Sequence, residues 1–116
     1  MEPRQTSVLL VGAGRGGVAL LNLLARQKVV KVVGVVDRRD EAPGVSLARD
    51  LGIPTGRDYQ QFLEFAERGE IDLVINVTGS SEVQRGLLAS CPEHVEVMGG
   101  HSAKLMWDLI ELCRER

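Results

Sequence analysis

Apolar residues gather in five short runs that are separated by longer mixed segments. Residues 7–11 (SVLLV) and 29–36 (VVKVVGVV) are almost continuously apolar and mostly β-branched or aliphatic. Such runs are typical of strands in a parallel sheet that helices cover on both faces. We expect strands at residues 7–11, 29–36, 53–55, 71–77 and 95–98.

The mixed segments carry apolar residues at helical spacing and end in residues that favour helix caps. Asp58 is a favourable N-cap, and Gly52 and Gly69 stand where a left-handed C-cap is needed. We expect helices at residues 16–27, 45–51 and 59–68, a fourth that Gly79 or Ser80 opens and that runs to about residue 90, and a fifth that Ser102 caps and that runs to the C-terminus.

Strand and helix therefore alternate five times, with short connections. Short loops and right-handed crossovers favour a parallel sheet with helices packed against it. The sequence predicts a single α/β domain over residues 1–116. Its predicted fold is a doubly wound parallel sheet of the Rossmann type, with five strands in the order 3-2-1-4-5.

Four glycines follow the first predicted strand in the stretch VGAGRGG. Gly12, Gly14 and Gly17 fit the pattern GxGxxG, which provides a tight turn, an approach for a pyrophosphate and close packing of helix on strand, respectively. Arg15 and Gly16 lie at the start of the helix, whose free amides favour phosphate groups. We predict that these five residues bind a dinucleotide. The alternative is a glycine turn that serves only packing in a domain without a ligand.

Asp37 lies at the carboxyl end of the second predicted strand, twenty residues after Gly17. There a carboxylate can accept hydrogen bonds from the ribose hydroxyls of adenosine and would repel a 2′-phosphate. Arg38 and Arg39 complicate the choice of cofactor, because a guanidinium beside the acid can pair with such a phosphate. The sequence predicts NAD as the cofactor, with NADP less favoured, and includes Arg38 among the cofactor-binding residues.

Two further loops leave the carboxyl edge of the predicted sheet, where such sheets bind their ligands. Thr78, Gly79 and Ser80 are predicted to line the cofactor through backbone and hydroxyl groups, and the alternative is that Ser80 is only a helix cap. His101 is the catalytic candidate, since its imidazole could act as acid or base at the nicotinamide end. The alternative is a solvent-facing loop histidine. His94 lies at the opposite edge and receives no role.

Composition narrows the class of protein without identifying a partner. The formal net charge is −2 with both signs interspersed, so we expect neither nucleic acid nor a membrane among the partners. The N-terminus lacks the apolar centre of a signal peptide, which favours a cytoplasmic protein. Cys91 and Cys113 belong to no ligand cluster, so no metal site is predicted. We interpret both as reduced thiols, with a redox role for Cys91 as the alternative.

The stretches VGAGRGGVALL, VVGVVDRR, ARDLGIPTGRDYQQFL and IDLVINVTG resemble the N-terminal nucleotide-binding domain of the glucose-fructose oxidoreductase and inositol dehydrogenase family. The resemblance covers about residues 7–90. It implies a Rossmann fold, a nicotinamide cofactor held by Gly12, Gly14, Gly17 and Asp37, and a sugar-like or small carbonyl substrate in the full enzymes. Those enzymes carry a Glu-Lys-Pro motif after the fifth strand and a C-terminal sheet domain. Here the equivalent stretch is MGGHSAK, in which Lys104 does not match by position, and residues 1–116 do not include the sheet domain.

The last 22 residues, VEVMGGHSAKLMWDLIELCRER, resemble instead the end of NAD-binding modules that precede sensor-kinase or other signalling regions in some bacteria. Leucines and other apolar residues form two neighbouring stripes on this segment, which favours a core face. We expect that the chain is cut from a longer protein within its last helix, ahead of a signalling or substrate domain. The exposed part of that helix would also allow a homodimer.

Three functions remain open from the sequence. The first is a module that binds or senses NAD(H) within a larger protein. The second is the cofactor half of an NAD(P)-dependent oxidoreductase that acts on a small carbonyl or sugar-like substrate. The third is a dimerising scaffold without a ligand.

Overall fold

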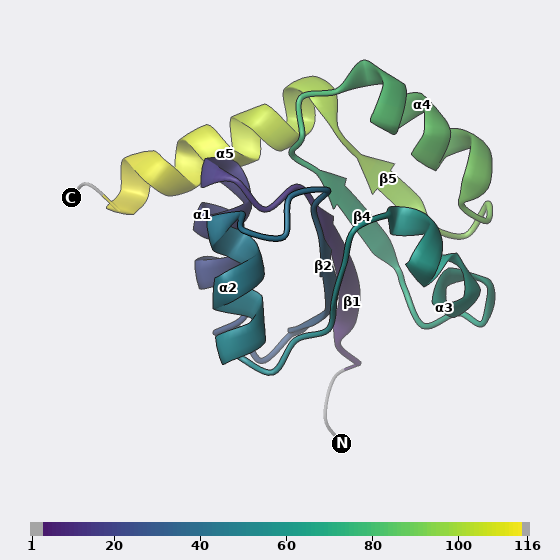
Figure 1. The fold of residues 1–116 in the computed structure, drawn as a ribbon, viewed down its shortest axis with the longest axis horizontal. Coiled ribbons are helices and arrows are strands. Elements are labelled where there is room, and N and C mark those ends of the chain that lie inside the picture. Colours follow the sequence, from purple (N-terminus) through teal and green to yellow (C-terminus); the bar gives the residue numbers. More distant parts are fainter. Residues whose placement is uncertain (1–3, 115–116) are drawn as a thin grey trace.

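A computed structural model describes residues 4–114 and contains a five-stranded parallel sheet in the order β3-β2-β1-β4-β5 (Figure 1). The elements in chain order are β1 (Thr6–Val11), α1 (Arg15–Leu24), β2 (Val30–Val36), α2 (Pro43–Asp50), β3 (Thr55–Gly56), the 3-10 helix η1 (Tyr59–Phe62), α3 (Leu63–Glu67), β4 (Leu73–Asn76), α4 (Ser81–Ser90), β5 (Glu96–Met98) and α5 (Gly100–Arg114). The predicted Rossmann arrangement and its strand order are confirmed.

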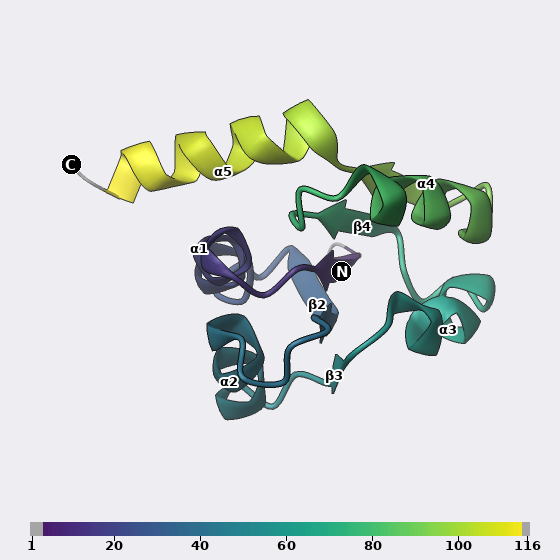
Figure 2. The same cartoon turned by 45° about the horizontal axis from the view of Figure 1, so that its top comes forward.

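Helices cover both faces of the sheet, with α1, α2 and α5 on one face and α3 and α4 on the other (Figure 2). The side chains of the central strand β1 alternate between these layers. Val8 and Leu10 enter the first core, and Leu9 and Val11 enter the second. The strand order reverses between β1 and β4, so the carboxyl ends of these two strands border the crevice in which such sheets bind ligands.

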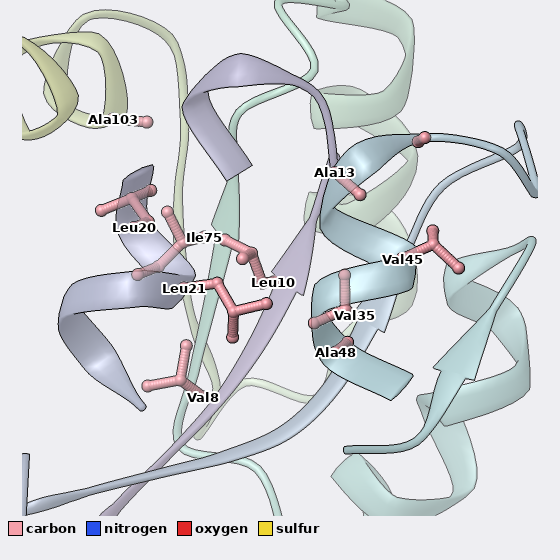
Figure 3. Packing of buried hydrophobic residues seen from close by; sticks show 11 residues of the cluster. Val8, Leu10, Ala13, Leu20, Leu21, Val35, Val45, Ala48, Ile75 and Ala103 are labelled. Atoms are coloured by element: carbon pink, nitrogen blue, oxygen red, sulfur yellow. The ribbon is translucent and has the colours of Figure 1, made fainter. Parts of the chain in front are cut away.

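The first core layer holds α1 firmly behind the glycine turn. Leu20 and Leu21 of α1 are fully buried in one cluster with Leu10 and Val35 of the sheet (Figure 3). Burial of an aliphatic side chain of this size contributes about 1.5–3 kcal/mol. Ala103, in the first turns of α5, is buried in the same cluster. The positions of α1 and α5 at the carboxyl edge are therefore set by apolar packing.

Gly34 interrupts the apolar run of β2 for a packing reason. The ring of Phe62 lies on this glycine, and the Cβ of any other residue would overlap the ring. The pairing of β1 with β2 also shifts by one residue between Val8 and Leu9. The second core layer thus requires a small residue at this point of β2.

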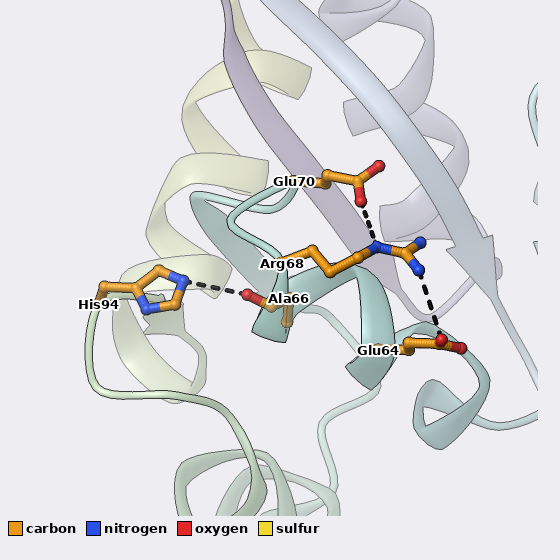
Figure 4. A network of polar contacts seen from close by, with 5 residues as sticks. All are labelled: Glu64, Ala66, Arg68, Glu70 and His94. Carbon is orange, nitrogen blue, oxygen red and sulfur yellow. Dashed lines mark hydrogen bonds and ion pairs between the residues drawn. The ribbon is translucent and has the colours of Figure 1, made fainter.

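A polar network lies at the amino edge of the sheet, at the end of α3 (Figure 4). Arg68 pairs with Glu64 at 3.3 Å and with Glu70 at 2.6 Å, and the hydrogen bond to Glu70 is the main reason that the pKa of Arg68 is raised. His94 lies on the same side, where its Nε2 atom is 3.0 Å from the Ala66 carbonyl oxygen that it binds as a donor. His94 therefore has a structural partner far from the glycine turn.

Several predicted element boundaries move. α1 ends at Leu24 rather than at residue 27, because the residues that follow are exposed and no packing holds a further turn. β3 is reduced to two residues, and the predicted helix 59–68 is divided into η1 and α3. The predicted caps hold: Asp58 accepts a hydrogen bond from the Gln60 amide at 2.9 Å, and Gly52 and Gly69 adopt φ angles of +75° and +78°.

The starts of the last two helices decide where the neighbouring side chains point. Ser80 caps α4, since its Oγ accepts a backbone amide hydrogen bond at 3.1 Å, so Gly79 is not the cap. Ser102 is not the cap that the sequence suggests. α5 already begins at Gly100, and the hydroxyl of Ser102 donates to the carbonyl of Gly99 at 3.0 Å. The expected continuation of this helix to the C-terminus falls on residues 115–116, which lie outside the described residues.

Within residues 4–114, no helix combines the length and the apolar character that crossing a lipid bilayer demands.

Candidate functional site

The turn between β1 and α1 is built around Gly12. Its φ angle is +108°, in the region that L side chains rarely adopt, and its amide donates to the carbonyl of Val36 at 2.7 Å. A Cβ at this position would lie 3.0 Å from the amide nitrogen of Thr78. Gly12 therefore brings the ends of β1, β2 and β4 together at one point.

Two of the remaining glycines serve packing. A Cβ on Gly17 would overlap the carbonyl oxygen of Gly12, so helix and strand approach as closely as the sequence pattern suggests. A Cβ on Gly16 would lie 3.1 Å from the ring of Trp107 in α5. Gly16 is thus covered by an indole and can meet a ligand only through its backbone.

Gly14 differs, because the space in front of it is open. Apart from the chain neighbours, the one group of residues 4–114 within 4 Å of a Cβ on Gly14 would be the Nη2 atom of Arg39, at 3.6 Å. Gly14 is the N-cap of α1, and no side chain caps this helix. The first hydrogen bond into the helix runs from the Val18 amide to the Gly14 carbonyl at 2.9 Å. The amides of the first turn and the positive end of the helix dipole are therefore directed at this space, which suits an anion.

Arg15 begins α1 and is exposed to solvent. Its side chain lines none of the three cavities described below. The assignment of Arg15 to the site stays a prediction.

Asp37 is bonded to the glycine turn through its side chain. One carboxylate oxygen accepts a hydrogen bond from the Ala13 amide at 2.8 Å, and the other accepts one from the Arg39 amide at 2.8 Å. The Nε atom of Arg39 lies 3.6 Å from the same carboxylate, whose side chain is 13% exposed. Each carboxylate oxygen keeps a lone pair for a further donor. Asp37 thus fixes the turn and can still receive a hydroxyl group.

The space between Asp37, the glycine turn and the end of β4 is a cavity of about 420 Å³, called here the β2-side cavity. Its volume lies within the usual range for small-molecule sites. Among the predicted cofactor-binding residues, Gly12, Gly14, Asp37, Arg38 and Thr78 line it. The fold thus gathers residues from three separate loops around one space. The lining residues that the sequence reasoning missed are Val11, Val36, Arg57, Asp58, Tyr59, Val77 and Val83.

Asn76 is the only buried polar residue in the described part of the chain, and it organises the loop after β4. Its side-chain oxygen accepts from the Thr78 amide at 3.0 Å and from the Thr78 hydroxyl at 2.7 Å. Its side-chain nitrogen donates to Gln84 in α4 at 2.9 Å. The Thr78 hydroxyl also accepts from the Ser80 amide at 3.0 Å. The sequence signal that could have found Asn76 is its position as a lone polar residue within the apolar run IDLVINV.

A second cavity of about 310 Å³, the β5-side cavity, lies between this loop, α4 and the first turns of α5. Gly79 is the one predicted cofactor-binding residue in its lining. On α5 the lining residues are Gly100, Ala103, Lys104 and Trp107, which share one helix face. His101 is exposed and lies outside this face. The catalytic role of His101 stays a prediction, and Lys104 is the charged residue of α5 that lines the cavity.

A larger cavity, of about 510 Å³, lies between α1 and α5 and contains none of the predicted site residues. Here the structure corrects the expected core face of the last helix. Met106 and Ile110 pack against the core, whereas Leu105, Leu109 and Leu112 are between 53% and 59% exposed. Only one of the two apolar stripes is buried, because α5 packs on the domain with only one part of its apolar face.

The cysteines and the possible metal ligands of residues 4–114 do not indicate a redox or metal site. Burial raises the pKa of the Cys91 thiol, which lowers its reactive thiolate fraction at neutral pH and weakens the redox alternative. Among residues 4–114, no three His, Cys, Asp or Glu side chains come together in a way that could hold a metal ion.

Comparison by sequence finds one related stretch and no matching family model. An acetaldehyde dehydrogenase of Spirochaeta aurantia is 33% identical over 82 residues, which is 70% of this chain and 26% of that enzyme. The chain therefore spans about a quarter of the length of this relative.

Comparison by structure establishes the fold. A protein assigned as an NADPH-dependent oxidoreductase of Desulfitobacterium hafniense superposes with a TM-score of 0.66 at 13% identity, over 93% of this chain and 32% of that one. A Rex-family repressor, RSP, in complex with β-NADH superposes with a TM-score of 0.58 at 17% identity, over 97% of this chain and 61% of the repressor. The chain spans less than two thirds of either protein.

One expectation about partners is wrong. The small net charge and the mixture of both signs predict no nucleic-acid partner. The same Rex-family repressor has been solved with β-NAD⁺ and operator DNA, and it shares the present fold over 97% of this chain with a TM-score of 0.57. A domain of this fold thus occurs within a DNA-bound protein of which it is only a part. The charge of such a domain therefore cannot exclude nucleic acid as a partner of the whole protein.

Proposed function

We propose that this chain is an NAD(H)-binding module of a larger protein. The observation that carries the proposal is the junction of the glycine turn with Asp37, whose carboxylate is bonded to the Ala13 amide at 2.8 Å at the rim of the β2-side cavity. A dinucleotide would lie across the carboxyl edge of the sheet, with its adenosine ribose at Asp37 and its pyrophosphate before Gly14. The Rossmann fold supports this, as do the relatives whose names state NADH, NAD⁺ or NADPH.

NAD is favoured over NADP because the carboxylate of Asp37 would repel a 2′-phosphate. Three guanidinium groups, those of Arg38, Arg39 and Arg57, line the same cavity and act in the opposite sense. Arg39 is held partly by its ion pair with Asp37, which reduces its capacity to bind a phosphate. The preference for NAD over NADP therefore depends on the carboxylate of Asp37.

Asp37→Ala is expected to weaken NAD binding by roughly tenfold to 100-fold, because a hydrogen bond to a charged acceptor contributes about 1.5–3 kcal/mol. NADP binding should weaken less or improve, since the arginines of the cavity remain. Calorimetric titration with both dinucleotides measures the two affinities. Asp40→Ala is the matched control: Asp40 is exposed and pairs with Arg49 outside the cavity. Tighter binding of NADP than of NAD by the unmodified chain would contradict the assignment of Asp37.

The cofactor half of an oxidoreductase is the second candidate function. The observation that favours it is the 33% identity to an acetaldehyde dehydrogenase. The resemblance to the glucose-fructose oxidoreductase and inositol dehydrogenase family points in the same direction. The resemblance to modules that precede signalling regions favours a sensing role instead. A cytoplasmic location belongs to this proposal under both alternatives.

A turnover assay separates the two candidates. As a sensing module, the chain is expected to bind NADH without oxidising it in the presence of acetaldehyde or other small carbonyl compounds. The loss of NADH absorbance with time measures turnover. His101→Ala is the informative variant, since turnover that this substitution removes would favour the oxidoreductase and assign His101 to the reaction.

A further inference from the structure

The two cavities at the carboxyl edge differ in the charge of their linings. The β2-side cavity contains Asp37 and Asp58 beside its arginines. Within the described residues 4–114, the β5-side cavity is lined by the cationic side chains of Arg85 and Lys104 and by no acidic residue. The β5-side lining thus lacks the carboxylates that the β2-side lining places beside its arginines.

The β5-side cavity is where the nicotinamide half of a bound dinucleotide would lie, and this step rests on the proposed function. Val77 and Ser80 line both cavities, so only the loop after β4 separates them. A dinucleotide whose ribose binds Asp37 and whose pyrophosphate lies at Gly14 extends across the point where the strand order reverses. Its second half then reaches the loop after β4 and the start of α5.

The charge of this cavity distinguishes the two redox forms of the ring. The oxidised nicotinamide ring carries a positive charge that the reduced ring lacks. Lys104 is partly neutralised, because its ammonium group lies 2.7 Å from both carboxylate oxygens of Asp108. Arg85 makes no ion pair with any residue in the described range 4–114. The amino ends of α4 and α5, at Ser81 and Gly100, add partial positive charge beside the same cavity.

We propose that the β5-side cavity favours reduced over oxidised nicotinamide, so that the chain binds NADH more tightly than NAD⁺. The positive charges of Arg85 and Lys104 raise the energy of the oxidised ring and leave the neutral reduced ring unaffected. Such a preference would make occupancy of the site depend on the ratio of NADH to NAD⁺.

Trp107 offers an independent readout of whether a reduced ring is bound. It is the only tryptophan of the chain, and it lines the β5-side cavity next to Gly16. The emission of an indole overlaps the absorption of a reduced nicotinamide ring, so a reduced ring bound at the carboxyl edge accepts excitation energy from Trp107. NADH in this cavity should therefore quench Trp107 emission, whereas ADP-ribose, which lacks the ring, should not.

The test is calorimetric titration of the full chain with NADH, NAD⁺ and ADP-ribose. The unmodified chain should bind NADH more tightly than NAD⁺ by roughly threefold to tenfold, the effect of one or two unit charges at nanometre distance in a partly solvated site. In the double variant Arg85→Gln, Lys104→Gln this ratio should fall to about one. The double variant Lys28→Gln, Lys31→Gln, which removes the same charge from residues outside this lining, should keep the ratio. Added salt should also reduce it.

The outcomes separate the two proposals. Failure of all three compounds to bind rejects the proposed function and the redox preference with it. Binding of ADP-ribose together with equal affinities for NADH and NAD⁺ overturns the redox preference and leaves the proposed function intact. A preference for NADH that survives the Arg85 and Lys104 substitutions also overturns it. Quenching of Trp107 by NADH with a ratio that depends on these two residues supports it.

Discussion

Replacement of Gly14 by valine is expected to remove NAD binding while the fold persists. Apart from its chain neighbours, the group in residues 4–114 nearest to an added Cβ is the guanidinium end of Arg39, at an ordinary contact distance of 3.6 Å. The branched side chain would instead fill the space through which a pyrophosphate approaches the first amides of α1. We expect at least a 100-fold loss of affinity, about 2.7 kcal/mol, measured by calorimetry.

Stability separates this effect from unfolding. The valine replaces a favourable N-cap residue, which costs about 1 kcal/mol and lowers the Tm by roughly 4–8 °C. Gly14→Ala provides a graded comparison, since a single methyl group fits the space and should weaken NAD binding less. An intact Gly14→Val variant that binds NAD normally would show that the pyrophosphate does not lie before α1.

Replacement of Gly17 by alanine is expected to have the largest effect on stability. The added Cβ would overlap the carbonyl oxygen of Gly12 and lie 2.9 Å from its carbonyl carbon. Neither group can move easily, because Gly12 is held at a φ angle of +108° within the turn. We expect a loss of about 2–4 kcal/mol in the free energy of unfolding. Urea denaturation followed by circular dichroism measures it.

Gly16→Ala is the matched control in the same helix. Its Cβ would lie 3.1 Å from the Trp107 ring, which belongs to a side chain that can shift by a few tenths of an ångström. Alanine also gains up to about 1 kcal/mol over glycine in a helix. The free energy of unfolding should therefore stay within about 1 kcal/mol of the unmodified chain. Equal stabilities of the Gly16 and Gly17 variants would contradict the packing role of Gly17.

The first βαβ unit could be predicted from the sequence because its signals are local. The run before Gly12 has the composition of a strand covered on both faces, and the spacing of Gly12, Gly14 and Gly17 has a mechanical reason at each position. The position of Asp37 at a strand end follows from the length of one crossover. Each of these inferences depends on residues within about thirty positions of one another along the chain.

Contacts between distant segments could not be predicted in the same way. No spacing rule relates Asn76 to Gln84 or the Trp107 ring to Gly16, because these pairs depend on how helices from separate parts of the chain pack on the sheet. The bond from Asp37 to the Ala13 amide is also tertiary. It gives the acid a second task, fixing the turn, that the sequence pattern does not indicate.

The last helix has one feature that follows from the sequence and another that depends on tertiary packing. Its existence follows from the sequence, but its start does not, because Gly99 and Gly100 carry no side chain that could cap it. In the structure α5 begins at Gly100, two residues before the predicted cap Ser102. The phase set by packing on the sheet directs Lys104 to the β5-side cavity, while His101 stays outside its lining.

The sequence by itself determined the Rossmann fold, its strand order, and the glycine turn with its acid. These are properties of local spacing and of apolar runs that can be buried in only one way. The tertiary structure alone decided which side chains share a cavity, and it thereby placed Asp37 in the lining of one cavity and Arg85 and Lys104 in the lining of the other. The physical reason is that a helix fixes the direction of its side chains only once its ends and its packing partners are set.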